Sequence, residues 1–263
     1  MKLVLELEIL VFGVTLLVGV MSGLLGIGGG IILTPLLLYL PPAAGLAPLD
    51  MKAVAGLTMV QSLFAAASGV IRHQRYGFVD RSVVIYMGSA IAVGSFLGAV
   101  LSHYMEAYTI QALFVGLATV AAGLLLFNTS ADEQEEGVEK VAFNRPLAIA
   151  VAALVGVMGG IVGQGGAFIL VPLMLHVLHL PTRITLGSSL GIVLFSSISG
   201  VVGKLGTCQV DLYLAAFLVA GAVPGAQLGG YLSRRVSTVR LRKLLTIIIL
   251  VTAIKMWYEL WRA

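Results

Sequence analysis

Long apolar runs, separated by short polar stretches, recur along the whole chain. Eight of them approach the ~20 residues that a helix needs to cross the hydrocarbon core of a bilayer. These runs are Leu3–Leu25, Ala53–Ile71, Val83–Leu101, Ile110–Phe127, Leu147–Val162, Ile184–Val202, Leu212–Leu232 and Leu244–Leu260. The pattern therefore predicts an all-α polytopic membrane protein with eight main helical segments.

One apolar stretch is interrupted by glycines. GLLGIGGGIILTPLLLYL, residues 23–40, contains five glycines, and Pro35 follows them. A glycine inside a helix costs about 1 kcal/mol relative to alanine, and proline lacks a backbone donor, so both predict helix breaks. Broken backbone at membrane depth is tolerated only where protein or trapped water satisfies it. We therefore expect this break to face an interior cavity.

The glycine stretch has a copy 137 residues later in the chain. Residues 19–38, GVMSGLLGIGGGIILTPLLL, and residues 156–175, GVMGGIVGQGGAFILVPLML, are identical at twelve of twenty positions. The match resumes further along at an offset of 131, so the chain is a tandem duplication. Between the copies lies ADEQEEGVEK, which is polar and acidic enough to be a solvated linker. The predicted units are a first membrane repeat (1–130), an acidic cytoplasmic linker (131–145) and a second membrane repeat (146–263).

The distribution of Lys and Arg indicates that the two repeats are inverted. These residues accumulate in short cytoplasmic loops. The first repeat has its basic loop after its second apolar segment, with Arg72, Arg75 and Arg81, where the second repeat has only Lys204. The second repeat has its basic loop after its third segment, in residues 234–243. We therefore expect two inverted repeats, each with a broken, re-entrant helical segment followed by three transmembrane helices, and both termini outside.

Composition limits the chemistry that such a protein can perform. Hydrophobic residues make up 59% of the chain and charged residues 11%, with a mean hydropathy of +1.05. No Asp, Glu, Arg or Lys falls near the middle of a predicted segment, which leaves dipoles and neutral donors for an intramembrane site. The single Cys208 excludes an intrachain disulfide. Neither GIGGG nor GQGGA continues into the Lys-Ser/Thr of a phosphate-binding loop, which argues against direct ATP hydrolysis.

The glycine breaks predict a site for a small anion. A helix that restarts after a break presents free N–H groups and the positive end of its dipole. In an inverted pair two such breaks would meet near the midplane, as in secondary transporters. The candidate substrate-binding residues are Gly26, Gly28, Gly29, Gly30, Thr58, Gln61, Ser62, Gly163, Gln164, Gly165, Gly166, Ser188 and Ser189, with helix breaks at Pro35 and Pro172.

Purely structural interpretations compete with this site. Glycines at GxxxG spacing let membrane helices approach closely without binding a ligand. Serine and threonine hydroxyls in membrane helices commonly bond to the preceding turn of their own helix. Duplication of the glycines, with a proline at the same register in each copy, favours the site.

The stretches GLLGIGGGIILTP and GGIVGQGGAFILVP resemble the sulfite exporter TauE/SafE family, and the resemblance covers essentially the whole chain. It implies a protein of the bacterial inner membrane that moves sulfur-containing or organic anions such as sulfite, sulfoacetate or a related sulfonate. The positions that the resemblance carries over are Gly26, Gly28, Gly29, Gly30 and Pro35 in the first copy and Gly163, Gln164, Gly165, Gly166 and Pro172 in the second. Ala167 stands where the first copy has Gly30, so we expect two unequal half-sites.

The expected function is a secondary transporter in which the two broken helices enclose the anion and rocking of the halves alternates access. No cofactor, metal or nucleic acid is expected, and coupling to a proton is left open. One alternative is an anion channel that uses the same dipoles. A second is an intramembrane enzyme that uses Ser188, Ser189, His176 and His179. A third is a scaffold whose glycines only pack helices.

Overall fold

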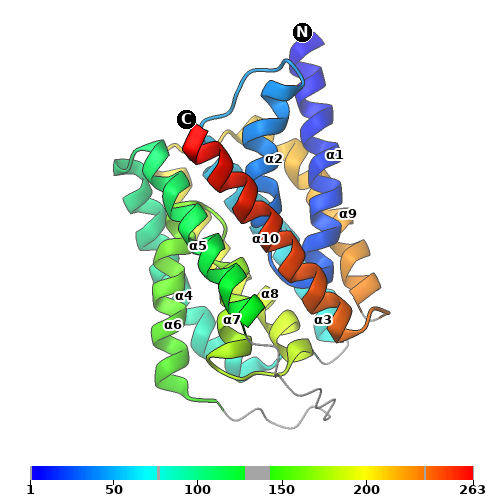
Figure 1. The fold of residues 1–263 in the computed structure, drawn as a ribbon, viewed down its shortest axis with the longest axis vertical. Coiled ribbons are helices and arrows are strands. Elements are labelled where there is room, and N and C mark those ends of the chain that lie inside the picture. The colour runs from blue at the N-terminus through cyan, green and yellow to red at the C-terminus, as the bar shows by residue number, and fades with distance from the viewer. Residues whose placement is uncertain (1, 76–77, 128–142, 234, 263) are drawn as a thin grey trace.

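The computed structural model describes residues 2–75, 78–127, 143–233 and 235–262, and every regular element among them is a helix (Figure 1). The helices are α1 (Lys2–Leu25), α2 (Gly30–Ala43), α3 (Met51–Arg75), α4 (Arg81–Leu101), the short 3-10 helix η1 (Ser102–Tyr104), α5 (Ala107–Phe127), α6 (Arg145–Val162), α7 (Ala167–His176), α8 (Thr182–Gly206), α9 (Leu212–Ser233) and α10 (Thr238–Arg262). Each of the eight predicted apolar segments corresponds to one of the long helices.

Seven of the described helices, α1, α3, α4, α5, α6, α8 and α9, are long and apolar enough to cross a membrane. Helix α10 contains the last predicted segment and is 25 residues long, but it is not among these seven. Helices α2 and α7 are shorter, with 14 and 10 residues. The protein is therefore an integral, multi-pass membrane protein.

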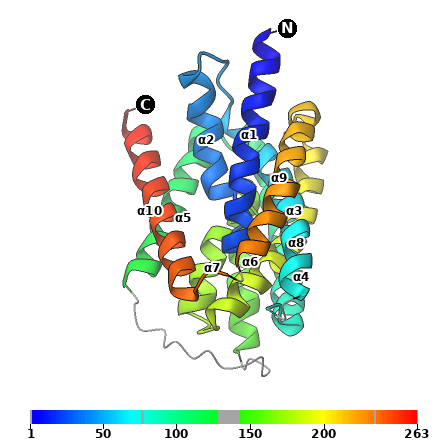
Figure 2. The same cartoon turned by 90° about the vertical axis from the view of Figure 1, so that its right-hand side faces the viewer.

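Glycine separates the helices at both predicted breaks. Helix α1 is followed by α2 across residues 26–29, and α6 is followed by α7 across residues 163–166. The φ angles are +66° at Gly28 and +61° at Gly165, in the left-handed region that favours glycine. Figures 1 and 2 show that α2 turns back beside α1 toward the N-terminal end, while α7 turns back toward the end where α6 begins.

The helix breaks predicted at Pro35 and Pro172 are wrong. Each proline is the sixth residue of its short helix, and the helix continues past it. A proline removes one backbone donor from the helix interior, and this loss does not end α2 or α7. At both places the helix is therefore interrupted at the glycines and not at the proline.

The two sequence repeats do not form separate lobes. Helix α9 of the second repeat packs along α1 and α3, and α4 of the first repeat packs along α6 and α8. A Cβ atom on Gly229 would lie 2.0 Å from the carbonyl oxygen of Val20, and one on Gly98 would lie 2.0 Å from that of Val157. These two contacts are equivalent under the repeat, so the same close approach occurs twice.

The helices can be divided into two groups by their packing. We call α1, α2, α3 and α9 the α1 bundle, and α4, α6, α7 and α8 the α6 bundle. Helices α3 and α8 pack against each other where the two bundles meet. Apolar side chains of α1, α2, α3 and α9 form a core of their own, which includes Val18, Leu37, Leu57 and Leu218. Helices α5 and α10 pack against each other beside the two bundles (Figure 2).

Helix direction and helix caps also repeat. In Figures 1 and 2, α1 runs away from the end that carries both termini, and α6 runs toward it. Asp80 and Asp211, equivalent in the repeat, accept backbone N–H bonds from Val83 at 3.0 Å and from Leu214 at 3.1 Å. Asn144 caps α6 by accepting the N–H of Leu147. Most of the predicted linker, residues 131–142, lies outside the described residues.

Candidate substrate site

The two glycine loops meet at the junction of the α1 bundle and the α6 bundle. A Cβ atom on Gly28 would lie 3.3 Å from a methyl carbon of Val193 on α8 and 3.5 Å from Cβ of Ala167 at the start of α7. A Cβ atom on Gly30 would lie 2.7 Å from Cγ of Gln164 in the second loop. Residues 130 or more positions apart in the sequence are thus brought into direct contact.

Both short helices begin at this junction without a side-chain cap. Gly29 and Gly166 are their N-cap residues, with φ angles of +79° and +75°. The carbonyl oxygen of Gly29 accepts its first bonds from Ile32 and Leu33, both at 3.1 Å, and that of Gly166 accepts from Ile169 and Leu170. The N–H groups before these donors have no partner within the helix, as at every helix N-terminus. Two positive dipole ends therefore meet at the junction.

Two hydroxyl groups stabilise the glycine loops across the repeat. Thr58 Oγ1 on α3 donates to the carbonyl oxygen of Gly163 at 2.8 Å, and Ser189 Oγ on α8 donates to that of Gly26 at 2.7 Å. Gly26 follows the last residue of α1, and Gly163 is the C-cap of α6, where carbonyl groups lack helical partners. Thr58 and Ser189 thus position the loops, and their hydroxyl protons are already used.

Other buried polar side chains at the junction have no hydrogen-bond partner among the described residues. They include both amide atoms of Gln61 and the hydroxyls of Ser196 and Ser197, whose side chains are 0% exposed. A Cβ atom on Gly29 would lie 2.7 Å from Gln61 Nε2, and one on Gly165 would lie 3.0 Å from Ser197 Oγ and 3.4 Å from Ser196 Oγ. Because buried polar groups are nearly always bonded, this unpaired cluster against two helix N-termini is a candidate for a ligand site.

The remaining predicted residues divide into two groups. Ser62 lies at the junction, where its hydroxyl donates to the carbonyl oxygen of Gly28 at 3.3 Å. Gln164 also lies there; its Nε2 donates to Thr34 Oγ1 at 2.6 Å, and its Oε1 is buried and unpaired. Ser188, in contrast, accepts the backbone N–H of Asp80 at 2.9 Å and is used to fix the start of α4.

Sequence reasoning missed Ser196 and Ser197. They lie two helical turns beyond Ser188 and Ser189 on α8, and the first repeat has Ala65 and Ala66 at the equivalent positions. A pair of adjacent hydroxyls in an otherwise apolar run was the available signal. The two half-sites are therefore unequal through α8 as well as through Ala167.

The prediction that Lys204 lies in a loop is wrong. Lys204 lies in the last turn of α8, where its side chain is 0% exposed. Its ammonium group donates to Ser102 Oγ at 2.6 Å, to Gln209 Oε1 at 3.0 Å and to the carbonyl oxygen of Ile161 at 3.3 Å. The packing of α8 against α4 and α6 encloses it, which the positions of charges in the sequence could not indicate.

Comparison with known proteins gives a family. The sulfite exporter TauE/SafE family matches residues 11–256. A "Probable membrane transporter protein" of Xylella fastidiosa (strain 9a5c) is 31% identical, over 94% of this chain and 92% of the relative. "Probable membrane transporter protein YunE" of Bacillus subtilis (strain 168) is 25% identical over 93% and 95%, respectively. No solved structure matches the chain.

These relatives are matched along nearly their whole length, and the family match includes both glycine loops and all of the helices that form the junction. The duplicated glycine stretch, the all-helical membrane fold and the family match agree with one another. The chain belongs to the sulfite exporter TauE/SafE family of membrane transporters.

Proposed function

We propose that this protein is a secondary transporter for a small sulfur-containing or organic anion, such as sulfite, sulfoacetate or a related sulfonate, in the bacterial inner membrane. The anion is held between the N-termini of α2 and α7. Its oxygens accept hydrogen bonds from the first N–H groups of both helices and from Gln61 Nε2, Ser196 and Ser197.

One observation carries this proposal: unpaired buried donors lie against two uncapped helix N-termini. Gln61, Ser196 and Ser197 supply three such side chains without a formal charge. Neutral donors and helix dipoles can balance a small negative charge in a dry site. The family's description as sulfite exporters supports the choice of anion.

We further propose that the α1 bundle and the α6 bundle move relative to each other, and that this motion opens the site to one side of the membrane or the other. The two sequence repeats are inverted, in agreement with the opposite directions of α1 and α6 (Figure 2). Helix α9 of the second repeat packs on α1 of the first, and α4 of the first repeat packs on α6 of the second. Each moving bundle therefore contains one long helix from the other repeat, so the bundles differ from the two halves of the sequence. The site lies between these units, where motion would open it to one side at a time.

The first test replaces the loop glycines. We expect Gly28→Leu and Gly165→Leu to abolish sulfite binding, because each leucine fills the junction and strains a backbone with positive φ. Binding of radiolabelled sulfite to purified protein measures this effect. Gly116→Leu is the matched control, since a Cβ atom there meets nothing within 4 Å. Normal binding by both loop variants would refute the site.

A milder variant separates binding from folding. Gln61→Met keeps the side-chain volume but removes an amide whose two polar atoms are unpaired. We expect sulfite affinity to fall about tenfold, because one hydrogen bond to a charged ligand is lost. The melting temperature without sulfite should be unchanged or higher, because no protein hydrogen bond is broken. A carrier should also show saturable counterflow of sulfite, and a channel should not.

A further inference from the structure

We propose that the seam between α4 and α8 is the path by which the anion passes between the glycine junction and the end of the molecule that carries both termini, with Lys204 as a second anion-binding position. This inference rests on the proposed function. In the described conformation the seam is closed, and Lys204 is bonded to protein oxygens instead.

Lys204 is a buried lysine whose hydrogen-bond partners among the described residues are all uncharged. Its three acceptors, the Ser102 hydroxyl, the Gln209 amide oxygen and the Ile161 carbonyl, would leave protonated Lys204 without a counter-ion in the part of the chain that the structure describes. Burial of a charge is unfavourable unless an opposite charge compensates it. A small anion can supply that charge when it replaces one or more of these acceptors.

Unpaired hydroxyls connect Lys204 with the glycine junction. Ser95 on α4 and Ser196 on α8 are both 0% exposed, and neither hydroxyl has a partner in the residues that the structure describes. A Cβ atom on Gly200 would lie 2.8 Å from Ser95 Oγ, which places that hydroxyl against α8 one turn beyond Ser196. Lys204 follows one turn later, about 12 Å from the level of Ser196 along the helix axis. The donors thus form a series from the junction to the ammonium group.

The corresponding seam between α3 and α9 lacks this series. The repeat places Ala226 at the position equivalent to Ser95, and Ala65 at the position equivalent to Ser196. Packing of equivalent helices therefore does not require these hydroxyls. Their presence in one seam only points to a function beyond helix contact.

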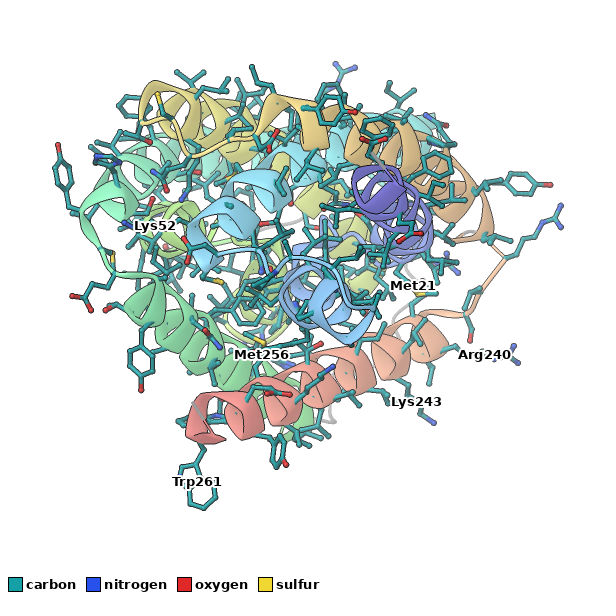
Figure 3. All side chains as sticks on the ribbon, turned by 90° about the horizontal axis from the view of Figure 1, so that it is seen from above. Met21, Lys52, Arg240, Lys243, Met256 and Trp261 are labelled. Carbon is teal, nitrogen blue, oxygen red and sulfur yellow. The ribbon has the colours of Figure 1, made fainter. Side chains whose placement is uncertain are left out.

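A second lysine lies further out on the same path. Lys52, at the start of α3, donates to the carbonyl oxygen of His103 at 3.1 Å, next to the Ser102 that Lys204 contacts. Lys52 is half-buried, and Figure 3 labels it on the face that carries both termini. The acidic side chains of Asp50 and Glu106 at this end are exposed to solvent. The two lysines along this path thus differ in burial: Lys52, nearer the end of the molecule, is half-buried, and Lys204, nearer the junction, is fully buried.

The experiment measures accessibility of the seam in reconstituted protein. The exposed Cys208 is first replaced by Cys208→Gly, which suits its φ of +55°. Ser95→Cys is then treated with the anionic 2-sulfonatoethyl methanethiosulfonate, with and without sulfoacetate, because sulfite itself would react with this reagent. The matched control is Ala226→Cys, the equivalent position in the other seam. We expect S95C to react at least about tenfold faster than A226C, because Lys204 concentrates anions in the seam. Sulfoacetate should slow the reaction of S95C.

A second variant isolates the charge of Lys204. In the S95C background, Lys204→Met should lower the ratio of the rate with this anionic reagent to the rate with a trimethylammonium reagent by about tenfold, and Lys204→Arg should preserve it. In the parent protein, K204M should slow the flux of divalent sulfite more than that of monovalent methanesulfonate. A purely structural lysine would change both fluxes equally and leave the reagent ratio unchanged.

The outcomes distinguish the two proposals. If sulfite is transported but S95C reacts no faster than A226C, the seam inference is wrong and the proposed function stands. If the reagent ratio is unchanged in K204M, Lys204 is not an anion position. If the C208G protein transports neither sulfite nor sulfoacetate, the proposed function fails, and the seam inference fails with it.

Discussion

Thr58 and Ser189 show that the position of a hydroxyl on a helix does not determine the acceptor to which it donates. Both were expected to line an anion site, and both lie at the glycine loops. Their hydroxyl protons, however, are donated to loop carbonyls. The sequence indicates where each residue lies along its helix. It does not indicate the acceptor of the hydroxyl's hydrogen bond, because that acceptor belongs to the other repeat.

This role gives a prediction at the residue scale. Thr58→Val should lower the free energy of unfolding by about 1–2 kcal/mol, because the buried Gly163 carbonyl loses its partner, and Ser189→Ala should have the same effect through Gly26. Denaturant titration in detergent measures both values. Ser199→Ala is the control, since its exposed hydroxyl bonds to Phe195 of its own helix. Losses no larger than in S199A would contradict the role of the two hydroxyls.

At the scale of helices, glycine has two separate functions in this chain. Gly28 and Gly165 end one helix and begin another, as their spacing in the sequence predicts. Gly98 and Gly229 instead lie inside long helices, where they admit the backbone of a partner from the other repeat. The sequence showed that both sets repeat, but only the packing distinguishes breaks from contacts.

The contact glycines give a prediction about helix packing. Gly98→Leu and Gly229→Leu should each destabilise the protein severely, since the new side chain would overlap the backbone of Val157 or Val20. Yield of folded protein and melting temperature after membrane extraction report the effect. Gly13→Leu and Gly123→Leu, where a Cβ atom meets nothing within 4 Å, should be tolerated. Equal tolerance of all four variants would mean that α1 does not pack on α9, nor α6 on α4.

At the scale of the whole molecule, the ends of the helices indicate how the chain lies in the membrane. The last turn of α3 and the first turn of α10 lie toward the end of the molecule where α6 begins, away from both termini (Figure 1). Basic residues near these turns, including Arg81, Arg235 and Arg240, favour the cytoplasm for this end.

Labelling of introduced cysteines tests this orientation in intact cells. In the C208G background, Gln74→Cys and Ser237→Cys should both be protected from a membrane-impermeant maleimide, and Tyr104→Cys at the other end should be labelled. Tyr104 is 78% exposed, so its replacement should not disturb packing. Labelling of Q74C and S237C on opposite sides would refute the inverted arrangement.

Much of this molecule was determined by the sequence alone. Apolar run lengths define the long helices because hydrocarbon admits few other structures. Glycine runs define the breaks because their backbone is permissive, and the offset of the two copies reveals the duplication. These are local properties of the chain, or comparisons of the chain with itself.

Only the tertiary structure decided which groups meet. The exchange of α4 and α9 between bundles, the unpaired Ser196 and Ser197 at the junction, and the enclosed Lys204 each depend on contacts between residues far apart in the chain. Small residues on α4 and α8 allow an approach close enough to bury an ammonium group at a helix end. Whether a side chain is buried or hydrogen-bonded depends on both of the surfaces that meet. The pattern along one segment does not specify which other segment packs against it.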